Sequence, residues 1–222
     1  MHKTLLAVAL SAGLIGGAQA EGDIGLSAAL ETTGLGAELT QAINQDLSLR
    51  VGYKAFSRSW DTTEDGLRLD GDIKVGGFNA LLDYHPFSNG FKLSAGIYVP
   101  RNKVSADGQF SQGGTIEING VTYSSADVQG VSASAKWNKV SPYIGIGYSG
   151  FARTESGFFF DGEVGVMYTG KAKTELAANC VSGSLVCDQL AGDIAAQKAK
   201  FDDDVGKVKW YPVVKVAVGY RF

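Results

Sequence analysis

Beyond its first 20 residues this sequence has no long apolar run. The chain has 222 residues, and past residue 20 no stretch stays apolar for the ~20 residues that a membrane-spanning helix needs. It also has only two cysteines and two histidines. Its 20 basic residues form no dense patch and are outnumbered by 23 acidic ones, so the chain has no general attraction for nucleic acid. These absences argue against a helical membrane protein and a nucleic-acid binder.

The N-terminus has the pattern of a cleaved signal peptide. Lys3 is followed by an apolar run from Leu5 to Ile15, and Ala18-Gln19-Ala20 supplies the small residues that a signal peptidase accepts. The alternative is a short buried helix. We predict a signal peptide over residues 1–20 and a single exported domain over 21–222. His2 would be lost with the signal, which leaves His85 as the one histidine of the exported chain.

The two cysteines, Cys180 and Cys187, lie close together in one polar segment. An exported chain folds under oxidising conditions, which favours a disulfide between them. A metal pair is the weaker alternative, because no histidine is nearby.

Repeated alternation of apolar and polar residues is the main signal in the exported chain, and it is typical of strands with two different faces. We predict eight strands. Residues 68–84 form one of them, with a bulge at Gly76-Gly77 that restores the apolar face. The full set is 24–31, 35–43, 47–55, 68–84, 91–99, 131–148, 158–168 and 214–222.

The connections between these strands alternate in length. Those near 44–46, 85–90 and 149–156 are short, whereas those near 57–67, 104–130 and 170–207 are long; 31–34 is the exception. Outer-membrane barrels have short periplasmic turns and longer outer loops, so the long connections would lie outside the cell. Within them, Asn119-Gly120 predicts a tight hairpin over 115–123. The helical spacing of Leu190, Ile194 and Phe201 predicts a short surface helix over 185–208.

Alternation alone does not show which face meets water, and a soluble secreted lipocalin-like barrel would alternate as well. Aromatic residues near the predicted strand ends favour a membrane barrel, because aromatic belts occupy the two membrane interfaces. The predicted fold is therefore all-β: a transmembrane up-and-down antiparallel barrel of about eight strands. One belt would comprise Tyr84, Phe91, Tyr148, Phe158 and Phe222, and the other Phe56, Trp60, Tyr168, Trp210 and Tyr211.

The inward face of such a barrel would carry charges of both signs. An eight-stranded barrel is filled by its own side chains or holds at most one small ligand. The charges would therefore pair with one another and plug the lumen, or they would line a thin solute path as in a narrow porin. The predicted network comprises Glu38, Arg50, Lys54, Asp83, Lys92, Asp161, Glu163, Lys215 and Arg221.

The last strand ends Val218-Gly219-Tyr220-Arg221-Phe222. This ending resembles the assembly signal of Gram-negative outer-membrane proteins, with Tyr220 and Phe222 as its aromatic positions. The exported chain resembles the small eight-stranded barrels of the OmpA transmembrane, OmpX and OmpW kind, and more narrowly a poorly characterised group of such proteins. Stretches that carry the narrower resemblance are 65–72, 83–87, 142–147 and 210–214. The resemblance implies location in the outer membrane, contact with its lipid, and insertion by the outer-membrane assembly machinery after escort by periplasmic chaperones.

Nothing in the chain indicates an enzyme. His85 precedes Pro86 at a predicted periplasmic turn, and no serine lies in a nucleophile motif. The run from Asp202 to Asp204 lacks the ligand spacing of a calcium loop. We expect no catalytic, cofactor-binding or metal-binding residues.

The expected function is a monomeric structural or surface-interaction protein, with the long outer loops as the places where an extracellular ligand would bind. The alternatives are a narrow porin, a barrel that holds a hydrophobic ligand in its outer mouth, and the soluble lipocalin-like barrel.

Overall fold

The computed structural model describes residues 23–64, 67–87, 89–110, 113–137, 139–181 and 186–222. The predicted signal peptide at 1–20 lies outside the described residues. Among the helices described, none has both the length and the apolar character needed to cross a membrane.

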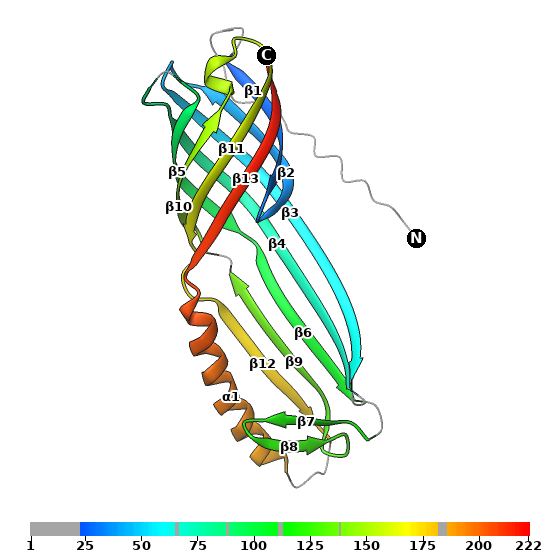
Figure 1. Ribbon diagram of the computed structural model, residues 1–222. Helices are drawn as coiled ribbons and strands as arrows, with labels where there is room; N and C mark the ends of the chain where they lie inside the picture. Colours follow the sequence, from blue (N-terminus) through cyan, green and yellow to red (C-terminus); the bar gives the residue numbers. More distant parts are fainter. Residues whose placement is uncertain (1–22, 65–66, 88, 111–112, 138, 182–185) are drawn as a thin grey trace, which may run out of the picture.

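The main body is a closed antiparallel barrel of eight strands, as the alternation predicts. Its order around the wall is β1-β2-β3-β4-β5-β10-β11-β13, and β13 pairs with β1 to close the ring. The start of β1 and the C-terminus lie at one end of the barrel, which we call the terminal end (Figure 1). The barrel strands are β1 (Ile24–Glu31), β2 (Gly34–Ala42), β3 (Leu47–Glu64), β4 (Leu67–Tyr84), β5 (Phe91–Pro100), β10 (Ser141–Ser149), β11 (Gly157–Tyr168) and β13 (Trp210–Arg221).

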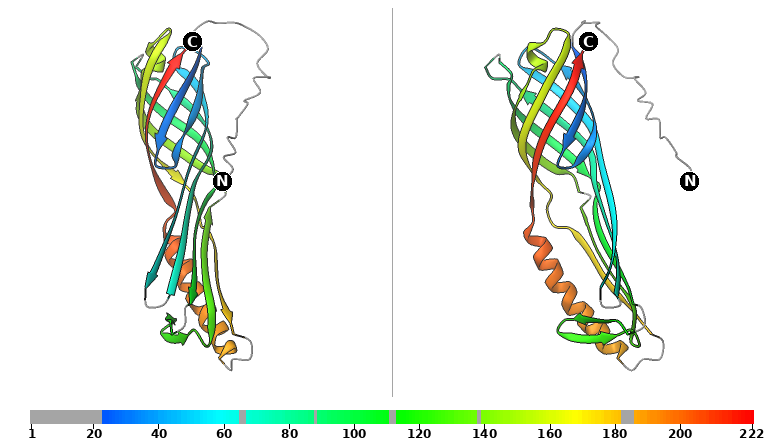
Figure 2. Two further views of the ribbon diagram at one scale, coloured as in Figure 1. Left: turned by 90° about the vertical axis from the view of Figure 1, so that its right-hand side faces the viewer. Right: turned by 45° about the vertical axis from the view of Figure 1, so that its right-hand side comes forward.

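At the opposite end the wall continues into a long extension (Figure 2). The far halves of β3 and β4 are joined there by β6 (Asn102–Phe110), β9 (Val128–Trp137) and β12 (Lys173–Cys180) in one antiparallel sheet. A helix, α1 (Cys187–Lys207), runs beside β12, and a hairpin of β7 (Thr115–Ile118) and β8 (Val121–Ser124) lies at the tip. A short 3-10 turn, η1 (Phe151–Arg153), lies at the terminal end.

The extension corrects the prediction of long loops. Residues 57–64 and 67 belong to β3 and β4, and the segments 104–130 and 170–207 hold β6 to β8, β12 and α1. The predicted strand 131–148 is two strands, β9 and β10, which pair with different neighbours. The predicted hairpin is confirmed, with Asn119 at φ 52° and Gly120 at φ 84°. The predicted helix is confirmed and fills nearly all of the predicted segment.

Strand β4 is one strand, as predicted, but the predicted bulge is wrong. Its register with β3 is continuous from Leu47 opposite Tyr84 to Leu67 opposite residue 64. Gly76 and Gly77 instead take φ of 142° and 141°, where each closely approaches the backbone of a neighbouring strand. The apolar residues change face between the two parts of the molecule: they lie on the outside of the barrel wall but on the inner face of the extension.

The two faces of the extension follow from this register. Residues on the lumen side of the wall continue into the extension as its inner face, where the Trp60 ring covers Gly71. The opposite, outer face carries almost entirely polar residues, such as the hydrogen-bonded pair Ser59 and Asp72 at 2.6 Å. Helix α1 packs on the inner face, since Lys198 and Asp202 both contact the inward-facing Thr174. Apolar residues of the inner face include Phe56, Trp60, Leu69, Ile73, Val75, Val104, Phe110, Val131 and Leu176.

A small apolar core stabilises the tip of the extension. Leu190 from α1, Tyr123 from the hairpin and Val128 from β9 are all buried in it. The Tyr123 hydroxyl and the Asn119 amide donate to the Asp193 carboxylate at 2.6 and 3.0 Å. These hydrogen bonds lower the pKa of Asp193. The extension is thus a folded unit and not a set of independent loops.

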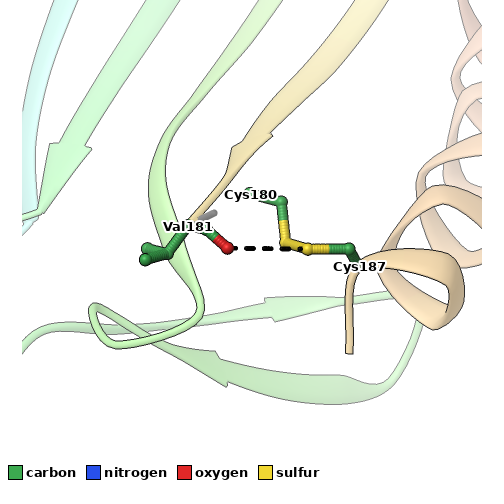
Figure 3. The surroundings of a disulfide bond; sticks show 3 residues. All are labelled: Cys180, Val181 and Cys187. Carbon is green, nitrogen blue, oxygen red and sulfur yellow. Dashed lines mark hydrogen bonds between the residues drawn. A yellow bond between two sulfur atoms is a disulfide. The ribbon is translucent and has the colours of Figure 1, made fainter. Parts of the chain in front are cut away.

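The predicted disulfide is confirmed. Cys180 and Cys187 are bonded, with their Cα atoms 5.8 Å apart. The bond joins the end of β12 to the start of α1, beside the hairpin, and the Cys187 sulfur lies 3.7 Å from the Val181 carbonyl oxygen (Figure 3). It therefore fixes the helix start against the tip core.

Several of the 30 glycines make room for large side chains in the lumen. The Tyr143 phenol lies against both Gly145 and Gly165, and a Cβ added at Gly165 would also lie 2.5 Å from the Ile144 carbonyl oxygen. A Cβ at Gly25 would lie 2.8 Å from the Phe151 ring. Glycine at these positions thus makes room for the Tyr143 and Phe151 rings in the narrow interior.

We predict that Gly165→Ala destabilises the barrel by about 1–3 kcal/mol, because it overpacks the lumen against Tyr143 and the backbone. Gly162→Ala on the same strand is the control, since a Cβ there meets nothing within 4 Å. Urea unfolding in detergent micelles measures both. Equal stability of the two variants would contradict this packing.

We predict that Cys180→Ala with Cys187→Ala loosens the extension and leaves the barrel intact. The bond closes a short loop, so the chain-entropy model gives about 2–3 kcal/mol of stabilisation. Limited proteolysis should show new cleavage in 170–207, while the unboiled protein should still migrate as a folded barrel on SDS gels. Chemical reduction of the wild type is the control. Loss of the folded band would show that the disulfide supports the barrel itself.

Candidate functional site: the barrel lumen

Nine buried ionisable side chains lie together in the middle of the lumen. They come from seven of the barrel strands, because inward-facing positions alternate along each strand. Five are carboxylates and four are cations, so the cluster has one formal negative charge in excess. Its members are Glu31, Glu38, Arg50, Lys54, Asp83, Lys92, Asp161, Glu163 and Lys215.

Arg50 is the centre of this cluster. Its guanidinium contacts three carboxylates: Nε lies 2.8 Å from Asp83, Nη1 lies 3.1 Å from Glu38, and Nη2 lies 2.5 Å from Glu163. The contact with Asp83 uses two nitrogens and both carboxylate oxygens. A planar guanidinium suits such a site because its donors point in several fixed directions.

Three lysines complete the pairing. Lys54 lies 2.6 Å from Glu38 and 2.9 Å from Glu31. Lys92 lies 2.7 Å from Glu163 and 2.8 Å from Asp161. Lys215 lies 2.9 Å from Glu38 and 3.2 Å from Asp161. Each lysine thus bridges two carboxylates, and every carboxylate contacts a cation.

Neutral hydroxyl groups donate further hydrogen bonds to three of the carboxylates. Tyr143 donates to Glu163 at 2.5 Å, Ser94 donates to Asp83 at 2.6 Å, and Thr33 donates to Glu31 at 2.6 Å. Buried charges need such partners, because a single unpaired ion in a low-dielectric interior is costly.

An apolar layer lies between the charges and the extension. Leu81, Tyr98, Tyr143, Met167 and Val213 form one buried cluster, and Tyr211 packs against it. The rings of Tyr98 and Tyr143 are 5.1 Å apart. The Lys54 ammonium lies 5.6 Å from the centre of the Tyr98 ring, so the apolar and charged layers meet there.

A second aromatic layer lies at the terminal end. The buried rings of Phe151 and Phe159 are 5.5 Å apart. The Arg221 guanidinium lies 4.5 Å from the Phe151 ring and donates to the Phe151 carbonyl oxygen at 2.5 Å. His85 is also at this end, with Nδ1 3.2 Å from the Phe91 carbonyl oxygen. Burial lowers the pKa of His85.

The structure brings together eight of the nine residues predicted for the lumen network. Arg221 does not join them, and the placement of its guanidinium beside Phe151 corrects that assignment. Arg221 faces inward as expected, but too near the end of β13 to reach the centre. Glu31 was missed because it was assigned to a turn. The alternation of Ser27, Ala29 and Glu31 on one face of β1 was the signal that could have found it.

Tyr220 and Phe222, the predicted assembly residues, lie on the outside of the barrel at the terminal end. Their rings are 5.2 Å apart, and Tyr220 also meets Phe158 at 5.2 Å. The other predicted belt needs correction. Tyr168 and Trp210 face outward and pack together at 5.0 Å. Phe56 and Trp60, however, lie on the inner face of the extension, and Tyr211 packs against the lumen layer.

Two solved structures of similar architecture are outer-membrane proteins. CarO2 of Acinetobacter baumannii is 27% identical, with a TM-score of 0.57 over 92% of this chain and 100% of that chain. CarO of the same organism is 22% identical, with a TM-score of 0.56 over 90% of this chain and 98% of that chain. A major outer membrane protein from Thermus thermophilus is 12% identical, with a TM-score of 0.43 over 90% and 99% of the two chains.

This chain is a small outer-membrane β-barrel. Sequence comparison finds no matching family model and no matching curated protein. In an outer-membrane barrel the short turns are periplasmic and the long connections are extracellular. We infer from this general pattern that the terminal end is the periplasmic end and that the extension lies outside the cell.

We predict that Glu163→Ala destabilises the barrel by about 3–5 kcal/mol if the cluster excludes water, because Arg50 and Lys92 would each lose a buried partner. Glu175→Ala is the matched control. Glu175 pairs with Lys136 at 3.1 Å on the exposed surface, where an ion pair contributes about 0–1 kcal/mol. Chemical unfolding of both variants in lipid vesicles measures the difference. Similar small losses for both would mean that water enters the lumen.

Proposed function

We propose that this barrel is a structural or surface-interaction protein whose lumen does not conduct. The observation that supports this most strongly is the burial of the four central cations. Arg50, Lys54, Lys92 and Lys215 are each at most 1% exposed, and each contacts at least two carboxylates. A solute path would need water beside these groups, because ions cross a pore by exchanging hydration for wall contacts.

The apolar layers above and below the charges support the same conclusion. A solute would have to displace the packed rings of Tyr98 and Tyr143 on the extracellular side, and those of Phe151 and Phe159 on the periplasmic side. The interior of an eight-stranded barrel is just wide enough for side chains to fill it or for one small ligand, and here packed side chains occupy it. The alternative of a narrow porin requires that these layers open.

The extension supports an interaction role. It has its own apolar core, a disulfide and a helix, so it presents a fixed surface above the membrane. Rigid surfaces bind partners with a smaller entropic cost than flexible loops do. We propose that the extension carries the function and that the barrel anchors it as a monomer.

The export route is also part of this proposal. We propose that residues 1–20 are removed on export, and that Tyr220 and Phe222 direct assembly by the outer-membrane machinery after chaperone escort. We assign no catalytic role to the chain, since the lumen side chains pair with one another and His85 lies at a periplasmic turn.

We expect the purified wild-type barrel to give no single-channel steps in a planar lipid bilayer. The reason is that the charged cluster, the apolar layer around Tyr98 and Tyr143, and the aromatic layer of Phe151 and Phe159 fill the cross-section of the lumen. A general porin reconstituted in parallel shows that the assay detects open channels. Reproducible, resolved steps from pure monomeric protein would overturn the proposal and favour the porin.

A further inference from the structure

Four lysines form a continuous row across the outer face of the extension. Lys74 of β4 faces Lys103 of β6, Lys103 faces Lys136 of β9, and Lys136 faces Lys173 of β12. The four strands lie side by side in the sheet just beyond the barrel (Figure 1). We call this set the lysine row. Helix α1 packs beside β12 on the other face of the sheet, where Lys198 and Asp202 contact Thr174. On the outer face Lys74 and Lys173 are exposed, and Lys103 and Lys136 are partly exposed.

Such a row is unfavourable for the sheet alone. Like charges at directly facing positions of neighbouring strands repel one another. Lys136 has a partner, Glu175, at 3.1 Å. Within the described part of the chain, Lys74, Lys103 and Lys173 have no ion pair within 4 Å. Glu175 supplies one carboxylate to the four lysines of this row, so an excess of positive charge remains for an external anion.

The lysine row lies just above the lipid. Phe78 is exposed on the barrel wall, where it packs against Tyr53 at 4.7 Å, and the Arg101 guanidinium lies 5.6 Å from its ring. Lys74 precedes Phe78 by four residues on β4, and the distance between them along the strand is about 13 Å at 3.3 Å per residue. With a strand tilt near 45°, Lys74 lies about 9 Å farther than Phe78 from the middle of the membrane. Lysine stems lie along apolar surface and extend their ammonium groups to a nearby interface.

The charges are sorted by height on this face. Exposed Arg101, Lys139 and Lys171 also lie at the junction with the barrel. Further from the membrane, Asp61 faces Asp70, and Asp70 faces Asp107 in a row of carboxylates. Arg68 lies beyond Asp70 on this face and pairs with it at 3.3 Å. Among the described residues of this face, the cations that have no carboxylate within 4 Å are those nearest the lipid, which matches an anionic membrane surface.

We propose that the lysine row binds the phosphate groups of lipid headgroups in the outer leaflet. The partner class follows from charge and position: several fixed cations, at headgroup height, on a face that points away from the extension's interior. The proposal rests on the placement of the barrel in the outer membrane and is independent of whether the lumen conducts.

The test is lipid binding by the purified barrel in an uncharged detergent, counted by native mass spectrometry. The probes are lipid A, chemically dephosphorylated lipid A, and inorganic phosphate as a competitor. The test variant is Lys74→Gln/Lys103→Gln/Lys173→Gln. The control is Lys198→Gln/Lys200→Gln/Lys207→Gln, which removes the same charge from α1. Migration of unboiled protein on SDS gels shows that each variant is folded.

We expect lipid A to bind the wild type, and to do so more weakly as salt is raised. Each lysine near an anionic surface contributes about fivefold in affinity, so the test variant, which lacks three of them, should bind roughly 100-fold more weakly. The control variant should change by less than about threefold on the same basis, because its lysines lie on the helix, which packs on the other face. Lys74→Arg/Lys103→Arg/Lys173→Arg should keep the wild-type affinity.

Three outcomes would overturn the proposal. Equal losses in the test and control variants would show a nonspecific charge effect. Equal binding of dephosphorylated lipid A would show that the phosphates are not recognised. Competition by inorganic phosphate at the lipid's own concentration would indicate a site for soluble anions. If the glutamine variant does not fold, wild-type binding that is insensitive to salt and to dephosphorylation is the overturning result.

Discussion

The contact of Arg50 with three carboxylates is the constraint on which the rest of the barrel depends. A buried guanidinium must be paired, so Glu38, Asp83 and Glu163 have to converge on it from three different strands. Each of these carboxylates in turn contacts a lysine, and the lysines reach Glu31 and Asp161. The side chains take up the narrow interior, and glycine at positions such as Gly165 and Gly52 makes room for them. Strand register, charge and glycine placement are therefore one linked requirement.

One continuous alternation of residues along a strand fits two environments in this chain, lipid around the barrel and water around the extension. Along β4 the lipid-facing positions are Phe78, Ala80 and Leu82, whereas in the extension the apolar positions are Leu69, Ile73 and Val75 on the opposite face. No residue is inserted between the two sets. The register continues because the barrel needs its apolar side outward and the extension needs it inward. A phase change in the sequence therefore marks the level at which the membrane ends.

This inversion explains which parts of the fold could be predicted. The barrel strands follow from local alternation, the hairpin from Asn119-Gly120, and the disulfide from export and proximity. The extension was assigned to loops because its sheet depends on pairings between distant segments, such as β6 with β4, which no local pattern specifies. Phe56 and Trp60 were assigned to an aromatic belt for the same reason. In the lumen, alternation predicted the central charges. To place Glu31 and Arg221 correctly, however, one must know where the ends of β1 and β13 lie relative to the neighbouring strands.

The two sets of cations in this molecule show how structural charge differs from charge that is available for binding. In the lumen every lysine is within 3.2 Å of two carboxylates, because the interior offers no water to stabilise it. In the lysine row water can stabilise each ammonium, so pairing is not needed for folding. The sheet nevertheless places these lysines opposite one another and places its aspartates further away. Folding gains nothing from that arrangement, and an anionic surface beside the row is the partner that would make it favourable.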